Sequence, residues 1–336
     1  MIWMALGALY VVWSTTFVAI RVVNETLPPL SATAVRFLVA GGVLYAIAIR
    51  RGDRRGDRPG PAQWRASAVV GVLLMFAGNG GVVWAERTIP TGIAALIIAT
   101  VPLWMAVIDR VAYHHRQPVL VNAGLVLGFA GAAALVGGSL AGDVDAPGLL
   151  LVVGAAMCWA AASLYQRRAP LPHRPFVGAG MQMLVAGGCF LGAGTLAGEL
   201  GRIDASRFSR ASLIALAYLI VFGSWIGFTS YLWLLRNART SLVSTYAYVT
   251  PVGAVLLGAI VLNETITART VLAGALVVIA VAIIITAGSA ARALDPGEDR
   301  GAKLEPEGGL ERVSGAEQRG LGQDGRRDLQ ADGEPA

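Results

Sequence analysis

The sequence predicts an all-α integral membrane protein with ten transmembrane helices, arranged as two inverted repeats of five helices each. Three observations lead to this prediction. Hydrophobic residues make up 55% of the 336 residues and charged residues only 14%, whereas a soluble domain carries about 25% charged residues. Ten apolar windows each approach the roughly 20 residues that a helix needs to cross a bilayer. The last five windows also repeat features of the first five.

The ten windows are continuous apolar runs, which favours helices over the alternating strands of a membrane barrel. We expect residues 1–138 to form the first repeat and residues 139–288 the second. Residues 289–336 are rich in Gly, Asp, Glu and Arg, and we predict a disordered cytoplasmic tail there. The windows cover residues 3–20, 30–49, 66–86, 91–109, 119–138, 147–166, 176–197, 213–235, 241–262 and 270–288.

Arginine residues divide the connections between the windows into two sets. Thirteen arginines fall in connections 2–3, 4–5, 6–7 and 8–9, and six fall in the opposite set. The positive-inside rule then places both termini in the cytoplasm, for a protein of the cytoplasmic (inner) membrane. We attribute the net charge of +6 to the arginines of these loops. No basic face interleaved with aromatic residues occurs, so we predict no nucleic-acid partner.

An internal repeat connects the two halves of the chain. An offset of 149 residues aligns the third and fourth windows with the eighth and ninth, and an offset of 146 aligns the first with the sixth. Because each repeat holds an odd number of helices, the second repeat would enter the membrane from the opposite side, as in many secondary transporters. The matched pairs include Gly78 with Gly227, Trp84 with Trp233, Thr91 with Thr240, Pro102 with Pro251, and Trp13 with Trp159.

Two of the matched residues are prolines within predicted helices. A proline removes a backbone hydrogen bond and kinks the helix, and matched interruptions in two repeats indicate a transport site. We therefore predict that Pro102 and Pro251 act in gating. The alternative is a packing kink without a function.

Several short motifs resemble those of the EamA-type transporters of the drug/metabolite transporter superfamily. They are Trp13-Ser14-Thr15 followed by Phe17–Ile20, then Arg36-Phe37, Thr100-Val101-Pro102-Leu103 and Asn263-Glu264-Thr265. The resemblance implies a secondary transporter that exports small amphipathic or aromatic metabolites or drugs, coupled in some members to an ion gradient. One departure is that Glu264 has no counterpart after the fourth window.

Polar and aromatic side chains recur at helical spacing in six of the windows, so that they share helix faces. We predict that they line one cavity that binds a small-molecule substrate. Packing is the alternative for the aromatic residues, and mid-membrane hydroxyls often bond across helices or to their own backbone. The predicted substrate-binding residues are Trp13, Ser14, Asn79, Thr100, Trp104, Trp159, Ser163, Tyr231, Tyr246 and Tyr248.

Two charged residues in the apolar windows are candidates for function. A carboxylate inside a membrane is costly and indicates a functional site, so we predict that Glu86 is a proton or cation site for coupling. The alternative is a surface ion pair with its neighbour Arg87. Arg36 either binds an anionic group or snorkels to the outer interface.

Other function classes lack the residues that they need. The three histidines, His114, His115 and His173, all lie between windows, so we predict no metal, no cofactor and no enzyme. A phosphate-binding G-x-x-x-x-G-K-[ST] loop is missing from the sequence, which argues against a primary pump. A nucleotide-sugar or sugar-phosphate carrier is an alternative that needs several basic residues in its cavity. We expect membrane lipid as a partner. The sequence leaves open whether the protein is a homodimer or a monomer.

Overall fold

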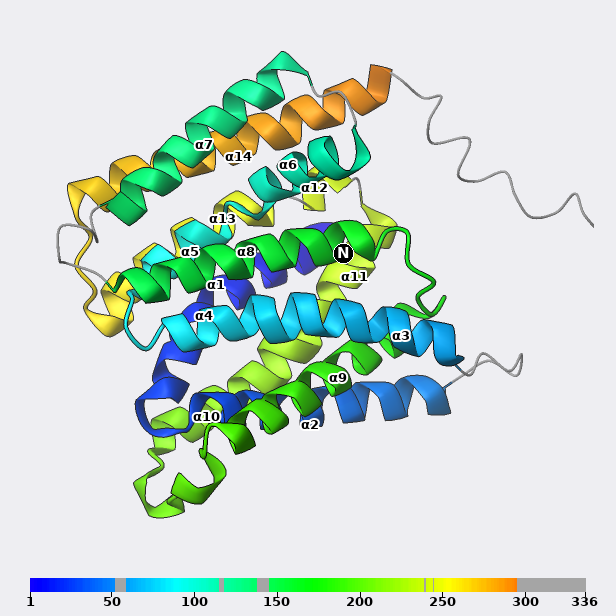
Figure 1. The fold of residues 1–336 in the computed structure, drawn as a ribbon, viewed down its shortest axis with the longest axis vertical. Coiled ribbons are helices and arrows are strands. Elements are labelled where there is room, and N and C mark those ends of the chain that lie inside the picture. The colour runs from blue at the N-terminus through cyan, green and yellow to red at the C-terminus, as the bar shows by residue number, and fades with distance from the viewer. Residues whose placement is uncertain (52–58, 115–117, 138–144, 239, 244, 295–336) are drawn as a thin grey trace, which may run out of the picture. The chain divides into compact units, whose positions relative to one another are not determined.

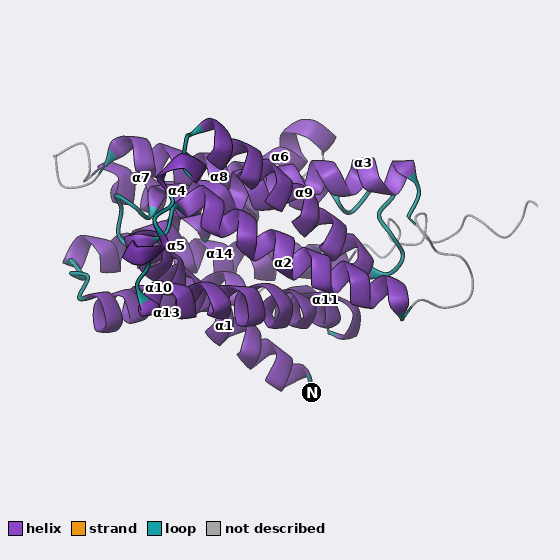
Figure 2. Ribbon diagram, turned by 90° about the horizontal axis from the view of Figure 1, so that it is seen from below, coloured by secondary structure: helices purple, strands orange, loops and turns teal. Residues whose placement is uncertain are grey.

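A computed structural model describes residues 1–51, 59–114, 118–137, 145–238, 240–243 and 245–294 of the chain. Met1–Ser289 form one compact unit, and Ala290–Ala336 are a separate unit. All regular elements of the described residues are helices (Figure 2). Most of the predicted tail at 289–336 lies outside the described residues.

The helices follow the predicted windows closely, because a long apolar run can satisfy its backbone in lipid only as a helix. In chain order the elements are α1 (Ile2–Thr26), α2 (Pro29–Arg50), α3 (Pro61–Val70), η1 (Gly71–Asn79), α4 (Gly80–Ala85), α5 (Thr91–Ile98), α6 (Val101–Tyr113), α7 (Val119–Gly137), α8 (Ala146–Tyr165), α9 (Pro175–Leu196), η3 (Leu200–Arg202), η4 (Ala205–Arg207), α10 (Arg210–Tyr218), η5 (Leu219–Ile226), α11 (Gly227–Asn237), α12 (Thr240–Val243), α13 (Tyr246–Leu262) and α14 (Ala268–Leu294).

Eight helical segments of the described residues are long and apolar enough to cross a membrane. Two further apolar helices are shorter, at Val119–Leu135 and Tyr246–Leu262. The all-helical, membrane-protein character is therefore confirmed. The count of ten crossings and the inverted repeat remain predictions.

The helices of Met1–Ser289 lie in an ordered arrangement (Figure 1). α7 and α14 lie together along one edge, and α2 and α9 pack against each other along the opposite edge. α1, α5, α8 and α13 lie between these two pairs. The helices at the periphery, α2, α7, α9 and α14, are the four that carry few polar residues in the sequence. The helices that carry most of the predicted site lie at the centre.

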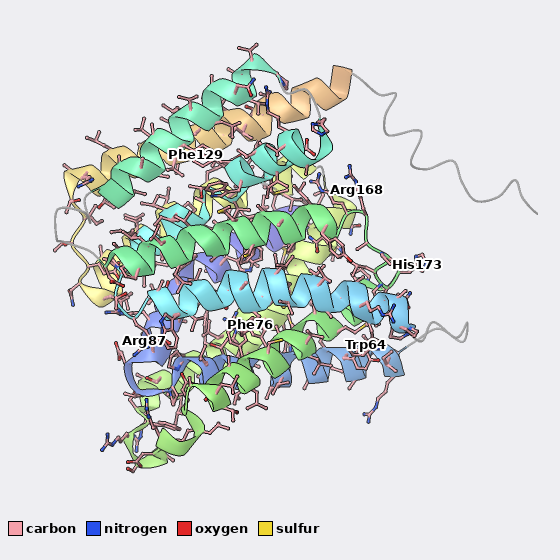
Figure 3. The ribbon with its side chains drawn as sticks, viewed as in Figure 1. Trp64, Phe76, Arg87, Phe129, Arg168 and His173 are labelled. Atoms are coloured by element: carbon pink, nitrogen blue, oxygen red, sulfur yellow. The ribbon has the colours of Figure 1, made fainter. Side chains whose placement is uncertain are left out.

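The bundle has two ends that hold different connections. In Figure 1 the connections α1–α2, α4–α5, α9–α10 and α13–α14 lie at one end, which we call the cap end, and the α8–α9 connection lies at the other. Figure 3 shows Arg87 at the cap end and Arg168 and His173 at the opposite end. Several arginines assigned to connections in fact lie inside or at the ends of helices; α1, for example, continues past Arg21 to Thr26.

The fourth and ninth windows are each broken into two helices. The first break is a turn at 99–100, and Pro102 follows it in the first turn of α6, where proline loses no intrahelical bond. The prediction that Pro102 lies mid-helix is therefore wrong. The second break separates α12 from α13, and Pro251 lies inside α13. The two prolines do not occupy equivalent places in their helices.

The third and eighth windows each contain a π-helical segment, η1 and η5. The offset of 149 residues carries 71–79 onto 220–228, so the two segments overlap in all but the ends of these ranges. π-helical turns are rare and concentrate at functional sites. Their matched positions are the clearest sign of a repeat in the backbone.

Candidate functional site

Five aromatic rings meet between four helices at the centre of the bundle; we call them the aromatic cluster. Trp13 of α1 is the hub, and the other members are Trp159 of α8, Phe228 and Tyr231 of α11, and Tyr246 of α13. Ring centroids lie 4.7 Å from Trp13 to Tyr246, 5.3 Å to Tyr231, 6.4 Å to Phe228 and 6.5 Å to Trp159. These are ordinary distances for interacting aromatic rings. Four of the predicted substrate-binding residues are therefore neighbours in space.

Two glycines allow the tryptophans to pack this closely. A Cβ on Gly227 would lie 2.8 Å from Nε1 of Trp13, and a Cβ on Gly78 would lie 3.3 Å from the ring of Trp159. The packing is reciprocal, because each tryptophan contacts a glycine of the opposite half of the chain. Both the tryptophans and the glycines are pairs that the sequence offsets predict.

The predicted hydroxyl groups make structural hydrogen bonds. Ser14 Oγ donates to the carbonyl oxygen of Thr250 at 3.2 Å, which joins α1 to α13 beside Pro251. Ser163 Oγ donates to the carbonyl four residues earlier in its own helix, and Thr100 Oγ1 to the carbonyl three residues earlier. Hydrogen bonds across helices or within one helix, the alternative stated for mid-membrane hydroxyls, therefore account for the contacts of all three residues in this conformation.

The remaining predicted residues lie around the cluster. Trp104 packs edge-on against Phe129 of α7, with centroids 4.9 Å apart (Figure 3), and also joins the hydrophobic group that includes Trp159. Tyr248 packs with Tyr246 against the core beside α14. Asn79 lies at the end of η1, and its Oδ1 atom is buried without a hydrogen-bond partner in the structure.

Glu86 lies at the end of α4 and is fully buried, with an exposed fraction of 0%. Neither carboxyl oxygen has a hydrogen-bond partner in the structure. The charged side chains that act on it electrostatically are Glu264 and Arg21, and Arg21 Nη1 donates to the backbone carbonyl oxygen of Glu86. The alternative of a surface ion pair with Arg87 is wrong, because Arg87 instead lies over the ring of Trp84.

Two carboxylates that the sequence did not single out as site residues bind helix N-termini at the cap end. Glu264 accepts hydrogen bonds from the backbone N–H groups of Thr91 (2.8 Å) and Gly92 (3.2 Å) and from the Thr91 hydroxyl (2.7 Å), at the start of α5. Glu199 accepts from the N–H groups of Leu30 (3.2 Å) and Ser31 (2.7 Å), and from the Ser31 hydroxyl (2.8 Å), at the start of α2. Unpaired N–H groups and the helix dipole favour a negative charge at each place.

Arg36 is buried in the bundle, with an exposed fraction of 3%. Its Nε donates to Ser224 Oγ at 3.1 Å, and the guanidinium lies 5.0 Å from the centroid of the Phe37 ring. The snorkelling alternative is therefore wrong, since a side chain that reaches the interface would be exposed.

Known proteins resemble this chain over most of its length. The EamA-like transporter family matches the chain over residues 1–137 and 146–286. The chain is 38% identical over 286 residues to a protein of Escherichia coli K12 named uncharacterized inner membrane transporter YedA, covering 84% of this chain and 90% of that one. It is 22% identical over 287 residues to the uncharacterized transporter YvbV of Bacillus subtilis, covering 85% and 92% of the two chains.

A solved crystal structure also resembles this chain, with a TM-score of 0.59 and 21% sequence identity. The match covers 85% of this chain and 98% of that chain. This likeness supports the fold of the helical bundle.

Proposed function

Because the chain belongs to the EamA-like transporter family, we propose that it is a secondary transporter that exports small amphipathic or aromatic solutes by alternating access. The chain is a multi-pass membrane protein similar to an inner membrane transporter. We place both termini in the cytoplasm, on the arginine distribution of the loops. The cap end would then face away from the cytoplasm.

The observation that carries this proposal is the aromatic cluster. Flat rings of a solute stack on aromatic side chains, and tyrosine hydroxyls supply polar contacts at the same surface. Trp13, Tyr231 and Tyr246 come from three different helices, so a solute held between them would touch parts of both halves. In the present conformation the rings contact one another, and a solute would replace these contacts.

Movement of the halves would open the cluster to each side in turn. The supporting features are the broken helix α5–α6 at Pro102, the proline inside α13, and the matched π-helical segments η1 and η5. Broken helices near the midplane are typical of secondary transporters, because the free backbone groups line the cavity. The family matches at 1–137 and 146–286 support division into the repeats 1–138 and 139–288.

Glu86 would couple transport to a proton or a cation. A buried carboxylate without a partner is costly while charged, and taking up a cation removes that cost. Glu264 and Arg21 both act on the Glu86 carboxyl, and Glu264 also binds the start of α5. A charge change at Glu86 would therefore reach a contact that joins the two halves.

Counterflow in proteoliposomes tests the transport proposal. Purified protein would be reconstituted and preloaded with one member of a panel of aromatic amino acids and cationic drugs, with an imposed pH gradient. We expect accumulation of a labelled aromatic solute above the level of empty vesicles, and loss of this signal in Trp13→Ala. Absence of transport for the whole panel, in both pH directions, would contradict the proposed substrate class.

Cysteine labelling tests the location of the site. After Cys158 and Cys189 are replaced, single cysteines at Trp13, Asn79 and Trp159 should react with a polar thiol reagent and be protected by a transported solute. Ala160→Cys is the matched control, since its side chain is fully buried next to Trp159. Failure of all three test positions to react would remove the aromatic cluster as the site.

Substitution of Glu86 tests the coupling role. We expect Glu86→Gln to keep counterflow but to lose its response to a pH gradient, and Glu86→Asp to keep that response. If Glu86→Gln is expressed normally and retains wild-type pH dependence, Glu86 does not couple transport to protons.

A further inference from the structure

The guanidinium of Arg36 has no anionic partner in the part of the chain that the structure describes. No acidic side chain there forms an ion pair with it, its Nε is bound only to the Ser224 hydroxyl, and Nη1 has no hydrogen-bond partner. A buried cation that is not neutralised is costly. An anionic group that is not part of the protein would relieve this cost if it lay beside Nη1.

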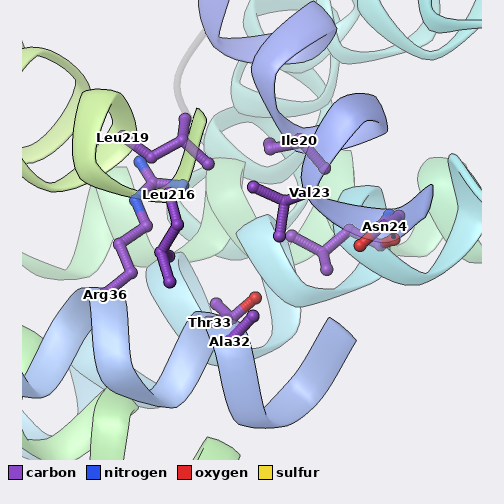
Figure 4. Close-up of a pocket in the computed structure, with 9 residues that line it drawn as sticks. Ile20, Val23, Asn24, Ala32, Thr33, Arg36, Leu216 and Leu219 are labelled. Carbon is purple, nitrogen blue, oxygen red and sulfur yellow. Dashed lines mark hydrogen bonds between the residues drawn. The ribbon is translucent and has the colours of Figure 1, made fainter. Parts of the chain in front are cut away.

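A small space lies beside this side chain (Figure 4). Its walls are mostly apolar and come from α1, α2, α4, α10 and η5. Three polar residues line it, Asn24, Thr33 and Arg36. Its volume of about 10 Å³ is roughly that which one water molecule needs. The space therefore admits one small group at a time, such as a halide ion or one oxygen atom of a carboxylate.

The hydrogen-bonding state of the wall shows which sign of charge the space favours. The Thr33 hydroxyl donates to the carbonyl oxygen of Pro29, and the Asn24 amide N–H donates to that of Val83. Two polar atoms of the lining residues have no hydrogen-bond partner. Nη1 of Arg36 is a donor that belongs to the charged guanidinium, and Oδ1 of Asn24 is a neutral acceptor. The charged donor dominates, so the space favours an anionic group.

A wider cleft lies at the cap end. Its volume is about 230 Å³, and it is lined by the end of α1, by Arg87 and by the segment 202–208. Asn24 lines both the cleft and the small space, so the two are neighbours on either side of this residue. The polar lining of the cleft consists of Asn24, Glu25, Thr26, Arg87, Arg202, Asp204 and Arg207.

The lining of the cleft carries more positive than negative charges. Three arginines face two acids, and Asp204 already pairs with Arg207 at 3.2 Å. Hydrogen bonds from the Ser206 side chain and backbone lower the pKa of Asp204, which keeps this pair charged. Glu25 offsets one of the two remaining arginines, Arg87 and Arg202, so the lining keeps a net positive charge, and a positively charged cleft concentrates anions.

We propose that Arg36 is a binding site for a monovalent anionic group no larger than a carboxylate, which reaches it through the arginine-lined cleft at the cap end. The group is either the carboxylate of the transported solute or a free halide ion. This inference rests on the proposed transport function only for the first of these sources. Binding itself can be measured on the purified protein without transport.

Thermal unfolding in detergent tests binding. The wild-type protein would be titrated with acetate and with chloride, at constant ionic strength against isethionate, a sulfonate that is larger than a carboxylate. We expect a saturable rise in Tm for at least one of the small anions, and no such rise in Arg36→Gln. The matched control is Arg269→Gln, because Arg269 is exposed and donates to the carbonyl of Ala134 outside both cavities. Equal responses of the wild-type protein and Arg36→Gln overturn the proposal.

Transport separates the two sources of the anion. Counterflow of tryptophan would be compared with that of tryptamine, which lacks the carboxylate, in chloride and in isethionate. If the solute carboxylate binds Arg36, Arg36→Gln loses about tenfold or more of its tryptophan uptake and keeps its tryptamine uptake. If a halide binds, uptake of both solutes needs chloride, and Arg36→Gln loses this dependence. Unchanged uptake of both solutes, together with an unchanged Tm response, leaves the site without support.

Two further variants cover the case in which Arg36→Gln does not fold. Arg36→Lys keeps the charge and should keep a weakened anion response. Gly223→Ala places a Cβ 3.2 Å from Nη2 of Arg36, so it should reduce the anion response without removing the charge. If both variants respond to acetate and chloride as the wild-type protein does, the proposal is wrong. If wild-type protein transports neither solute, the proposed function fails, while the Tm titration still decides the anion site.

Discussion

Replacing Glu264 by alanine should loosen the contact between the two halves of the chain at the start of α5. The carboxylate follows α13 in the second half and accepts three hydrogen bonds from Thr91 and Gly92 in the first half. The substitution leaves two helix N-terminal N–H groups and one hydroxyl without their acceptor. The expected result is a less stable protein with its fold retained.

The size of the effect follows from the three bonds. A hydrogen bond to a charged group contributes about 1.5–3 kcal/mol, and the interaction of the charge with the helix terminus adds a few tenths to 1 kcal/mol. The side chain is partly exposed, so water replaces part of the lost bonding and the sum must be discounted. We expect Glu264→Ala to lower the free energy of unfolding by about 3 kcal/mol, which corresponds to a Tm decrease of roughly 6–12 °C.

The assay is thermal unfolding of purified protein in detergent, followed by intrinsic tryptophan fluorescence. Glu264→Gln should fall between wild type and alanine, because its carbonyl oxygen can still accept from Thr91 without the charge. Glu199→Ala should lower the Tm by a similar amount, since it removes equivalent bonds from α2. Asp204→Ala is the control for loss of an exposed acid. A Tm of Glu264→Ala within 1 °C of that of Asp204→Ala would refute the reasoning.

Three further predictions follow from the aromatic cluster and the loops. Gly227→Ala should reduce counterflow about tenfold or more, because the new Cβ would lie 2.8 Å from Trp13 Nε1, whereas Gly188→Ala, with nothing within 4 Å, should be neutral. Wild-type counterflow in Gly227→Ala would contradict the packing argument. Ser163→Ala should transport normally, since this hydroxyl bonds to its own helix; a loss would indicate contact with solute. Reporter fusions should place both termini on the cytoplasmic side, and opposite sides for the two termini would rule out the topology.

The helices could be predicted from the sequence because the bilayer leaves few choices for a long apolar run. The windows at 119–138 and 147–166 end within one residue of α7 and α8. The break between α12 and α13 could not be predicted, because neither proline nor glycine marks it. Pro102 was expected to kink a helix, but a turn just before it places it in the first turn of α6.

The aromatic part of the site was also predictable. Trp13 and Trp159 align in the repeat, and the large rings that share central helix faces meet where these faces converge. The hydroxyl groups were not predictable, because a serine such as Ser163 changes its partner with a single side-chain rotation. For Arg36 the sequence left anion binding and snorkelling as alternatives, and its burial argues against snorkelling. The role of Glu264 was missed because its partner, Thr91, lies 173 residues away.

The contacts of the two halves divide into a symmetric and an asymmetric set. At the centre, Trp13 packs on Gly227 and Trp159 packs on Gly78. Each half therefore contributes a tryptophan that packs against a glycine of the other half. On the proposed alternating-access mechanism, a rotation of one half against the other would change both contacts together. This pair of contacts would then give no preference for one opening over the other.

On the proposed alternating-access mechanism, the preference for one opening would come from the cap end. Glu199 and Glu264 both belong to the second half, and both bind N-termini of helices in the first half, α2 and α5. These bonds join the halves at the cap end, so a wider opening of that end would break them. Glu264 is also one of the two charged side chains that act on the Glu86 carboxyl, so a cation taken up at Glu86 would change the electrostatic environment of Glu264 while it binds the start of α5.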